Sequence, residues 1–275
     1  MVGWSTGGDA GGGEVVAVLT IAGSDSGGGA GIQADLRTFF AHDVLGCTAV
    51  TALTAQNTLG VTRVEAASPG VVVAQIEAVM ADLPVRAAKT GMLATAAIVE
   101  AVAATWARVG RGPLVVDPVM VSTSGAALLE ADAVAAMRER LFPLAAVLTP
   151  NRAEAEALTG ERDAARAAEA LAELAPGAVI VVKGGDDDDP AWASDWVRAA
   201  DGGGRWLRAE RVATRATHGT GCTFAAAIAA GLARGAGVGE AIDAAKRYLT
   251  GALRAARPVG GGHGPVDHLW ALRRG

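Results

Sequence analysis

The chain has few of the residues that mark secreted, nucleic-acid-binding or membrane proteins. Cys47 and Cys222 are its only two cysteines, too few for a disulfide framework, and no charged segment with an apolar core opens it. Lysine and arginine number 24 against 29 acidic residues, so the basic surplus typical of nucleic-acid or membrane-surface binding is missing. Apolar runs such as "FAAAIAAGLA" are shorter than the roughly 18 residues of a membrane span. We expect a cytoplasmic protein that binds small molecules, not nucleic acid or a membrane.

Apolar residues are plentiful, at 51% of 275, and are enough for the core of a sizeable domain. Residues 1–13 are glycine-rich and lack periodicity, so we expect a disordered leader there. From residue 14 to 275, strand-like runs alternate with helix-like runs without a linker or a repeat, which predicts one domain. The expected strands lie at 14–23, 46–55, 85–91, 113–119, 145–150 and 178–185, followed by a hairpin in 192–217. The expected helices lie at 30–42, 70–82, 94–109, 130–141, 151–174, 220–235 and 238–257.

Several expected strands, such as "VIVV" at 179–182, are apolar throughout. Strands of this kind belong in a parallel sheet that helices cover on both faces. The sequence therefore predicts an α/β protein, a three-layer α/β/α sandwich with a mostly parallel central sheet.

The segments that follow the expected strands are where ligands bind in open α/β sheets. A glycine-rich segment, 27–31, follows the first strand, and Gln56 follows the second. The Gln56 amide offers the donor and acceptor needed to read the edge of a heteroaromatic ring, although an ordinary surface glutamine is the alternative. Asp117 lies at the end of the fourth strand with a carboxylate suited to hydrated Mg²⁺, or else it caps a helix. Lys183 ends the sixth strand.

Asn151 and Glu154 follow the fifth strand at the start of a helix. Their spacing is that of a capping box, which by itself accounts for both residues. Residues 218–222 read "HGTGC" before an alanine-rich helix, and Gly219 and Gly221 there suggest an anion-binding helix start, with simple turn formation as the alternative. No Walker P-loop occurs, and the glycine run gives only a fortuitous dinucleotide match. Taken together, these strand ends predict a phosphoryl-transfer site.

Eight motifs then appear in order from about residue 15 to residue 268: "GSDSGGGAGIQADL", "TALTAQNT", "KTGML", "VVDPVM", "TPNRAEAEAL", "VKGG", "HGTGC" and "GHGPVDH". The set closely resembles the hydroxymethylpyrimidine and phosphomethylpyrimidine kinases of thiamine biosynthesis, in the ribokinase-like superfamily. The resemblance implies ATP and Mg²⁺ as cofactors and a homodimer. It also implies two successive phosphorylations of 4-amino-5-hydroxymethyl-2-methylpyrimidine.

The resemblance also assigns a substrate site by position. Gln56 corresponds to the amide that reads the pyrimidine. The residues expected around the ring and its hydroxymethyl group are Gly23, Asp35, Thr54 and Met92.

A second group of positions corresponds to the nucleotide and metal site of the family. Asp117 and Glu154 are the expected organisers of Mg²⁺, through bridging water. Asn151, Lys183 and Thr220 are expected to line the phosphates.

Gly219, Gly221 and Cys222 correspond to the anion hole and its helix start. In sugar-kinase relatives an aspartate at the third position is the catalytic base. A thiol at a helix N-terminus has a depressed pKa and would suit proton removal, whereas the alternative role for Cys222 is to shape the pocket.

The chain departs from the family pattern in two loops. It has "VSTSGAA" where relatives often carry a lysine and "KGGDDDDP" where they often carry a histidine. Four aspartates, 186–189, would repel phosphate, so we expect them to face solvent. A pyridoxal kinase of the same superfamily is the nearest alternative function, and a non-catalytic pyrimidine sensor is a second.

Overall fold

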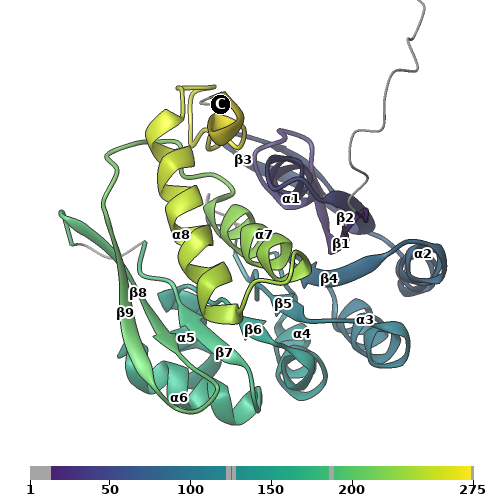
Figure 1. Ribbon diagram of the computed structural model, residues 1–275. Helices are drawn as coiled ribbons and strands as arrows, with labels where there is room; N and C mark the ends of the chain where they lie inside the picture. The colour runs from purple at the N-terminus through teal and green to yellow at the C-terminus, as the bar shows by residue number, and fades with distance from the viewer. Residues whose placement is uncertain (1–13, 122–124, 126–127, 186–188, 274–275) are drawn as a thin grey trace, which may run out of the picture.

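A nine-stranded sheet forms the middle layer of the protein, in a computed structural model that describes residues 14–121, 125, 128–185 and 189–273 (Figure 1). The strand order is β3-β2-β1-β4-β5-β6-β7-β8-β9. The strands are β1 (Ala17–Asp25), β2 (Leu45–Asn57), β3 (Gly60–Ala66), β4 (Val85–Thr90), β5 (Leu114–Val116), β6 (Val147–Leu148), β7 (Val179–Val182), β8 (Trp192–Arg198) and β9 (Gly204–Glu210). The pairs from β2 to β7 are parallel, and β3, β8 and β9 are antiparallel additions at the two edges.

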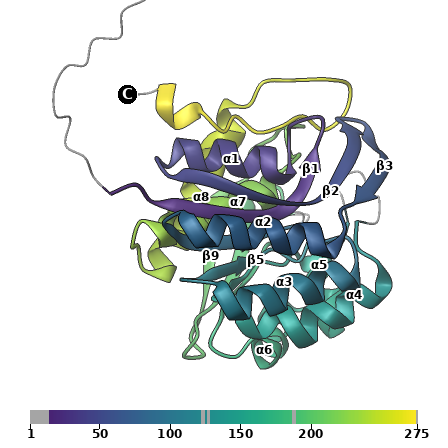
Figure 2. The ribbon, with the colours of Figure 1, turned by 90° about the vertical axis from the view of Figure 1, so that its right-hand side faces the viewer.

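Helices cover both faces of this sheet. They are α1 (Gly31–Ala41), α2 (Pro69–Asp82), α3 (Ala96–Val109), α4 (Ala131–Ala136), α5 (Arg152–Thr159), α6 (Ala164–Leu174), α7 (Thr220–Ala233) and α8 (Val238–Ala255), with short helical turns η1 (Met137–Leu141), η2 (Phe142–Leu144) and η3 (Trp270–Arg273). Helices α1, α7 and α8 lie on one face, and α2, α3, α4 and α6 lie on the other (Figures 1 and 2). The predicted three-layer α/β/α sandwich is confirmed.

Side-chain alternation along the apolar strands divides the core between the two faces. In β1, Leu19 and Ile21 join the apolar cluster beneath α2 and α3, whereas Val18 joins the cluster beneath α7 and α8. Small residues predominate in α7 because this helix packs against the sheet, α1 and α8 at once. At its crossing with α8, a Cβ on Gly231 would lie only 3.1 Å from Ala241 Cβ.

The structure differs from the sequence prediction at three places. Strand β3 was not expected, and it pairs antiparallel with an elongated β2. The helix expected over 151–174 is two helices, because Gly160 adopts a left-handed conformation, φ +79°, and ends α5. The helix expected over 130–141 continues from α4 into η1. The expected leader, 1–13, lies outside the described residues.

Membrane crossing can be assessed for the described part of the chain. None of its helices combines the length and the apolar character that a bilayer span requires.

Candidate active site

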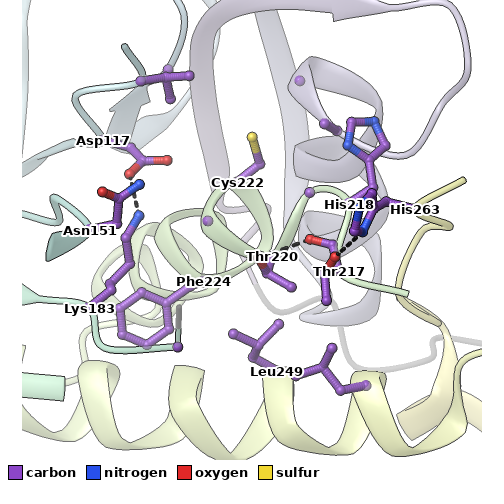
Figure 3. A pocket seen from close by; sticks show the side chains of 18 of the residues that line it. Asp117, Asn151, Lys183, Thr217, His218, Thr220, Cys222, Phe224, Leu249 and His263 are labelled. Carbon is purple, nitrogen blue, oxygen red and sulfur yellow. Dashed lines mark hydrogen bonds and ion pairs between the residues drawn. The ribbon is translucent and has the colours of Figure 1, made fainter. Parts of the chain in front are cut away.

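A cavity of about 610 Å³ opens at the carboxyl edge of the parallel strands, where the sequence predicted a site (Figure 3). The chain crosses this edge after each parallel strand and at the start of α7, so distant residues meet there. Asp35 alone among the predicted site residues does not line the cavity. Those that do are Gly23, Thr54, Gln56, Met92, Asp117, Asn151, Glu154, Lys183, Gly219, Thr220, Gly221 and Cys222.

One side of the cavity holds a buried ion pair. Lys183 Nζ, just after β7, donates to Asp117 Oδ1 at 2.8 Å, and Thr149 Oγ1 donates to the same oxygen at 3.0 Å. Asp117 follows β5, and its side chain is 2% exposed. Figure 3 shows Asp117 and Lys183 together with Asn151 on this side of the pocket. The Asp117 carboxylate thus accepts hydrogen bonds from two side chains, which does not fit a helix-capping role.

Glu154 brings a second carboxylate to the same side. Its Oε2 accepts the backbone N–H of Asn151 at 2.8 Å, and its own N–H donates to Asn151 Oδ1 at 2.8 Å. The capping box expected from the sequence is therefore present, while both residues also line the cavity. Burial raises the pKa of Glu154 to about 7, and Asp117 adds to this rise while Lys183 opposes it.

The two carboxylates fit a hard divalent cation. Two neighbouring buried carboxylates are hard to ionise together unless positive charge is supplied. Mg²⁺ binds oxygen ligands and is commonly held by one or two carboxylates, with waters and phosphate oxygens completing its shell. The described residues contain no group of three or more metal-binding side chains, so Asp117 and Glu154 would need that help from water and phosphate.

The start of α7 presents backbone N–H donors to the cavity. Gly219 is its N-cap, with φ +78° and no side-chain hydrogen bond to the helix. Helix geometry leaves the first-turn N–H groups, including those of Gly221 and Cys222, without a carbonyl partner inside the helix, and the helix dipole is positive there. A Cβ on Gly221 would lie 3.1 Å from Lys183 Nζ, so the helix start and the lysine face the same space. This arrangement suits a phosphate group.

The C-terminal segment holds the loop before α7 in place. His218 N donates to the Gly264 carbonyl at 3.0 Å. Thr223 Oγ1 donates to the Gly219 carbonyl at 2.8 Å and lies 3.0 Å from His268 Nε2. Burial lowers the pKa of His268 to about 4. The motif "GHGPVDH" thus has a structural role, because it fixes the backbone that presents the N–H donors.

The pKa of the Cys222 thiol differs from the value that the sequence led us to expect. Burial raises its pKa to about 11, against an opposing effect of Lys89, and Asp35 and Asp117 add to the rise. The prediction of a depressed pKa is therefore wrong, because desolvation outweighs the opposing charge of Lys89. Cys222 is a neutral thiol at the first turn of α7, in the middle of the pocket in Figure 3.

Asp35 lies beneath the site. Both oxygens of its fully buried carboxylate accept from Lys89 Nζ at 2.9 Å, and one also accepts from Thr20 Oγ1 at 2.7 Å. The expectation that Asp35 lies around the substrate ring does not match this placement, because α1 turns the residue inward toward β1 and β4. Lys89 is also fully buried and interacts electrostatically with Cys222, so the pair supports the site from below.

The expected pyrimidine site lies at the ends of β1, β2 and β4. Gln56 lies within β2, which runs further than expected, and not in a loop after it. Its Oε1 is 3.0 Å from Thr54 Oγ1, and its Nε2 is 3.3 Å from His218 Nε2. A Cβ on Gly23 would lie 3.1 Å from the sulfur of Met92, so glycine lets β1 approach that side chain closely. Gly23, Thr54, Gln56 and Met92, which were predicted to form this site together with Asp35, thus all line the cavity.

Sequence reasoning missed Asp25 and His218, which both line the cavity. Asp25 accepts backbone N–H groups from Gly27, Gly29 and Ala30 at 2.8, 2.9 and 2.8 Å, and its Oδ2 is 2.9 Å from His218 Nε2. Despite its burial, the pKa of Asp25 falls to about 2 because of these hydrogen bonds. An aspartate that opens a glycine run is a signal for this role, because loop N–H groups need an acceptor.

The remaining wall of the cavity includes several apolar side chains. Phe224 of α7 and Leu249 of α8, both labelled in Figure 3, line the cavity. The cavity also reaches a buried ion pair in which Lys246 Nζ donates to Asp195 Oδ2 at 2.7 Å. Asp195 also accepts the N–H of Gly184 at 3.0 Å and thereby fixes the loop after β7. Such an apolar wall beside phosphate-binding groups suits the flat base of a nucleotide.

The two unusual loops are described only in part. Asp189 is exposed, as expected, and accepts the N–H groups of Ala191 and Trp192 at 2.9 and 3.0 Å. The other three aspartates of the run, 186–188, and most of "VSTSGAA" lie outside the described residues.

A kinase for small molecules needs places for phosphate and metal and, next to them, a place for the acceptor. The carboxyl edge of this sheet provides these places side by side, and the fold and cavity are those of a ribokinase-like kinase. Residues 25–267 match the family model of phosphomethylpyrimidine kinase. A hydroxymethylpyrimidine/phosphomethylpyrimidine kinase of Synechococcus elongatus is 52% identical over 259 residues, which cover 92% of this chain and 97% of that protein. The chain belongs to the phosphomethylpyrimidine kinase family, and it is a phosphotransferase.

Two solved structures agree with this placement. The phosphomethylpyrimidine kinase of Clostridium difficile 630 superposes with a TM-score of 0.74 at 39% identity, covering 86% of this chain and 98% of that one. The pyridoxal kinase of Bacillus subtilis, in an ADP complex, superposes with a TM-score of 0.86 at 37% identity, covering 95% and 100%. The family relationship and the retained charged residues speak against a non-catalytic sensor.

Proposed function

We propose that this protein transfers the γ-phosphoryl group of ATP to 4-amino-5-hydroxymethyl-2-methylpyrimidine and then to its monophosphate, as a step of thiamine biosynthesis. The observation that carries the proposal is that the Gln56 amide and the start of α7 line one cavity. An acceptor ring held by the amide would thus lie beside the phosphate-binding helix start. The 52% identity to a hydroxymethylpyrimidine/phosphomethylpyrimidine kinase supports the choice of substrate.

In this proposal the protein acts mainly by positioning and by charge. Lys183 and the N–H groups at Gly221 and Cys222 hold the phosphoryl oxygens and stabilise the charge that develops on them during transfer. Asp117 and Glu154 would hold Mg²⁺, and the ion would supply charge neutralisation on the nucleotide phosphates. Asn151 fixes Glu154 through the capping box, and Thr220 lines the phosphates.

The activity is tested by incubating the purified protein with the pyrimidine and Mg-ATP and following products by mass spectrometry. Mono- and diphosphate should appear in sequence, and chelation of Mg²⁺ should stop both steps. Absence of both products, in a sample that is folded and binds ATP, would overturn the proposal.

Pyridoxal phosphorylation is a second candidate, because the Bacillus subtilis pyridoxal kinase superposes over 95% of this chain. A panel in which the pyrimidine and pyridoxal compete for limiting enzyme separates the two. We expect the pyrimidine to have the larger kcat/KM, since the Gln56 amide matches an aminopyrimidine edge. A larger kcat/KM for pyridoxal would reverse the assignment.

Three further parts of the proposal concern the whole molecule. We propose a single kinase domain over residues 14–275, a homodimer, and a cytoplasmic location. The single sheet supports the first, and the two free cysteines are compatible with a reducing compartment. Light scattering, which measures the molar mass in solution, tests the homodimer. Cell fractionation tests the cytoplasmic location.

Cys222 provides a prediction about the proton of the acceptor hydroxyl. Because the thiol pKa is about 11, we expect Cys222→Ser to keep kcat within about tenfold of wild type. Cys222→Asp should be slower than Cys222→Ser, because a carboxylate there adds negative charge near Asp117 and the phosphates. The measurement is kcat against pH, from 6 to 9, for all three proteins. A steep loss in the serine variant with partial recovery in the aspartate variant would instead establish the thiol as the base.

A further inference from the structure

His218 connects two parts of the cavity wall. Its Nε2 lies 2.9 Å from Asp25 Oδ2 and 3.3 Å from one end of the Gln56 side-chain amide. The other end of that amide lies 3.0 Å from Thr54 Oγ1, which is also 3.0 Å from the Ser24 carbonyl oxygen. The side chain of His218 is 9% exposed and that of Asp25 is 3% exposed, so these contacts are largely shielded from water.

The carboxylate of Asp25 decides which atom of His218 carries a proton. It accepts three backbone N–H groups, and a carboxylate so bound is ionised at neutral pH and has no proton to give. The contact between His218 Nε2 and Asp25 Oδ2 is therefore a hydrogen bond only if Nε2 carries the proton. This holds for the neutral ring protonated at Nε2 and for the charged ring alike.

A protonated Nε2 constrains the amide of Gln56. It has no lone pair in the ring plane, so it cannot accept a hydrogen bond from an NH₂ group. With the carbonyl oxygen toward His218, the same N–H is shared between Asp25 and Gln56, as in other three-centre hydrogen bonds. The NH₂ group then donates to Thr54 Oγ1, whose own proton goes to the Ser24 carbonyl. This orientation requires a half-turn of the amide and satisfies every group in the cluster.

We infer that His218, held by Asp25, is a positioning residue that determines substrate specificity by fixing the Gln56 amide with its carbonyl toward His218 and its NH₂ toward Thr54. The orientation of the amide rests on the contacts of His218 alone. The choice of an aminopyrimidine as the ligand rests on the proposed function. The amide then has one acceptor site free on the His218 side and one N–H free on the Thr54 side. A ligand must present a donor to the first and an acceptor to the second.

An aminopyrimidine edge meets this requirement, with its exocyclic amino group on the His218 side and its ring nitrogen on the Thr54 side. The 4-oxo analogue of the same pyrimidine has the opposite pattern, a carbonyl acceptor next to a ring N–H donor. A freely rotating amide would accept either compound, whereas a fixed amide rejects the second. A site built to hydrogen-bond one pattern discriminates strongly against its reverse, because buried polar groups are left unpaired.

The test compares kcat/KM for the 4-amino and 4-oxo compounds in two matched variants. His218→Met keeps the length of the side chain without a donor, and His218→Gln retains an N–H for Asp25. We expect the amino-to-oxo ratio to fall at least about tenfold in His218→Met, mainly through KM, and to recover in His218→Gln. In a Gln56→Ala background, His218→Met should have little further effect on the ratio. An unchanged ratio in His218→Met, with a normal melting temperature, would overturn the inference.

A second measurement does not depend on activity. In the wild-type protein labelled with ¹⁵N-histidine, NMR should show His218 with a proton on Nε2 at neutral pH. An unprotonated Nε2 would refute the orientation argument even if His218→Met failed to fold. If wild type phosphorylates neither compound, the proposed function fails, and the NMR result still decides the orientation of Gln56.

Discussion

Replacing Gly219 by alanine is expected to lower kcat by about 10²-fold or more and to lower the melting temperature as well. Gly219 has φ +78°, a conformation that costs about 1–2 kcal/mol for a residue with a Cβ. A Cβ there would also overlap the carbonyl oxygen of Gly29, which belongs to the backbone of the loop between β1 and α1. The backbone at Gly29 or at Gly219 must then move, so the N–H groups at the start of α7 no longer point at the phosphoryl group.

Gly221→Ala is the matched control for this prediction. Its Cβ would meet the end of a flexible side chain, Lys183 Nζ, at 3.1 Å, and Gly221 has an ordinary helical conformation. We therefore expect a normal melting temperature and a smaller loss of turnover. Thermal unfolding and steady-state kinetics on the two variants check the difference. If Gly219→Ala kept wild-type turnover, the start of α7 would have no part in transfer.

Lys89→Met is expected to give the largest loss of stability, about 3–5 kcal/mol, because it leaves the buried Asp35 carboxylate without a positive charge, and only the Thr20 hydroxyl still donates to it. For a chain of this size, each kcal/mol corresponds to roughly 2–4 °C, so the melting temperature should fall on the order of 10 °C.

The double variant Lys89→Met/Asp35→Leu separates charge from packing. An apolar pair can replace a buried ion pair with little loss, so most of the stability should return. Calorimetric unfolding of the single and double variants measures the recovery. Equal melting temperatures for the two would mean that lost packing, and not the unpaired charge, causes the destabilisation.

The strands that carry the site could be located from local sequence patterns. Asp117 and Lys183 each end a short apolar run, and the carboxyl ends of parallel strands meet at one edge, so their proximity followed from the order of elements. The capping box of Asn151 and Glu154 could also be predicted from the sequence, because its hydrogen bonds join residues only three positions apart. Strand β3 gave no such signal, because its residues are half-buried or exposed and lack clear alternation.

The sequence by itself determined the layered fold, the strand-end positions of most site residues and the glycine-rich start of α7, since each depends on periodicity or short-range backbone geometry. Only the tertiary structure decided that Asp35 faces Lys89, that His218 meets Asp25 across 193 positions of the chain, and that the Cys222 pKa rises. These three properties depend on which side chains surround a group and how far they exclude water. Burial and long-range partners are set by the packing of the whole chain, and no local pattern encodes them.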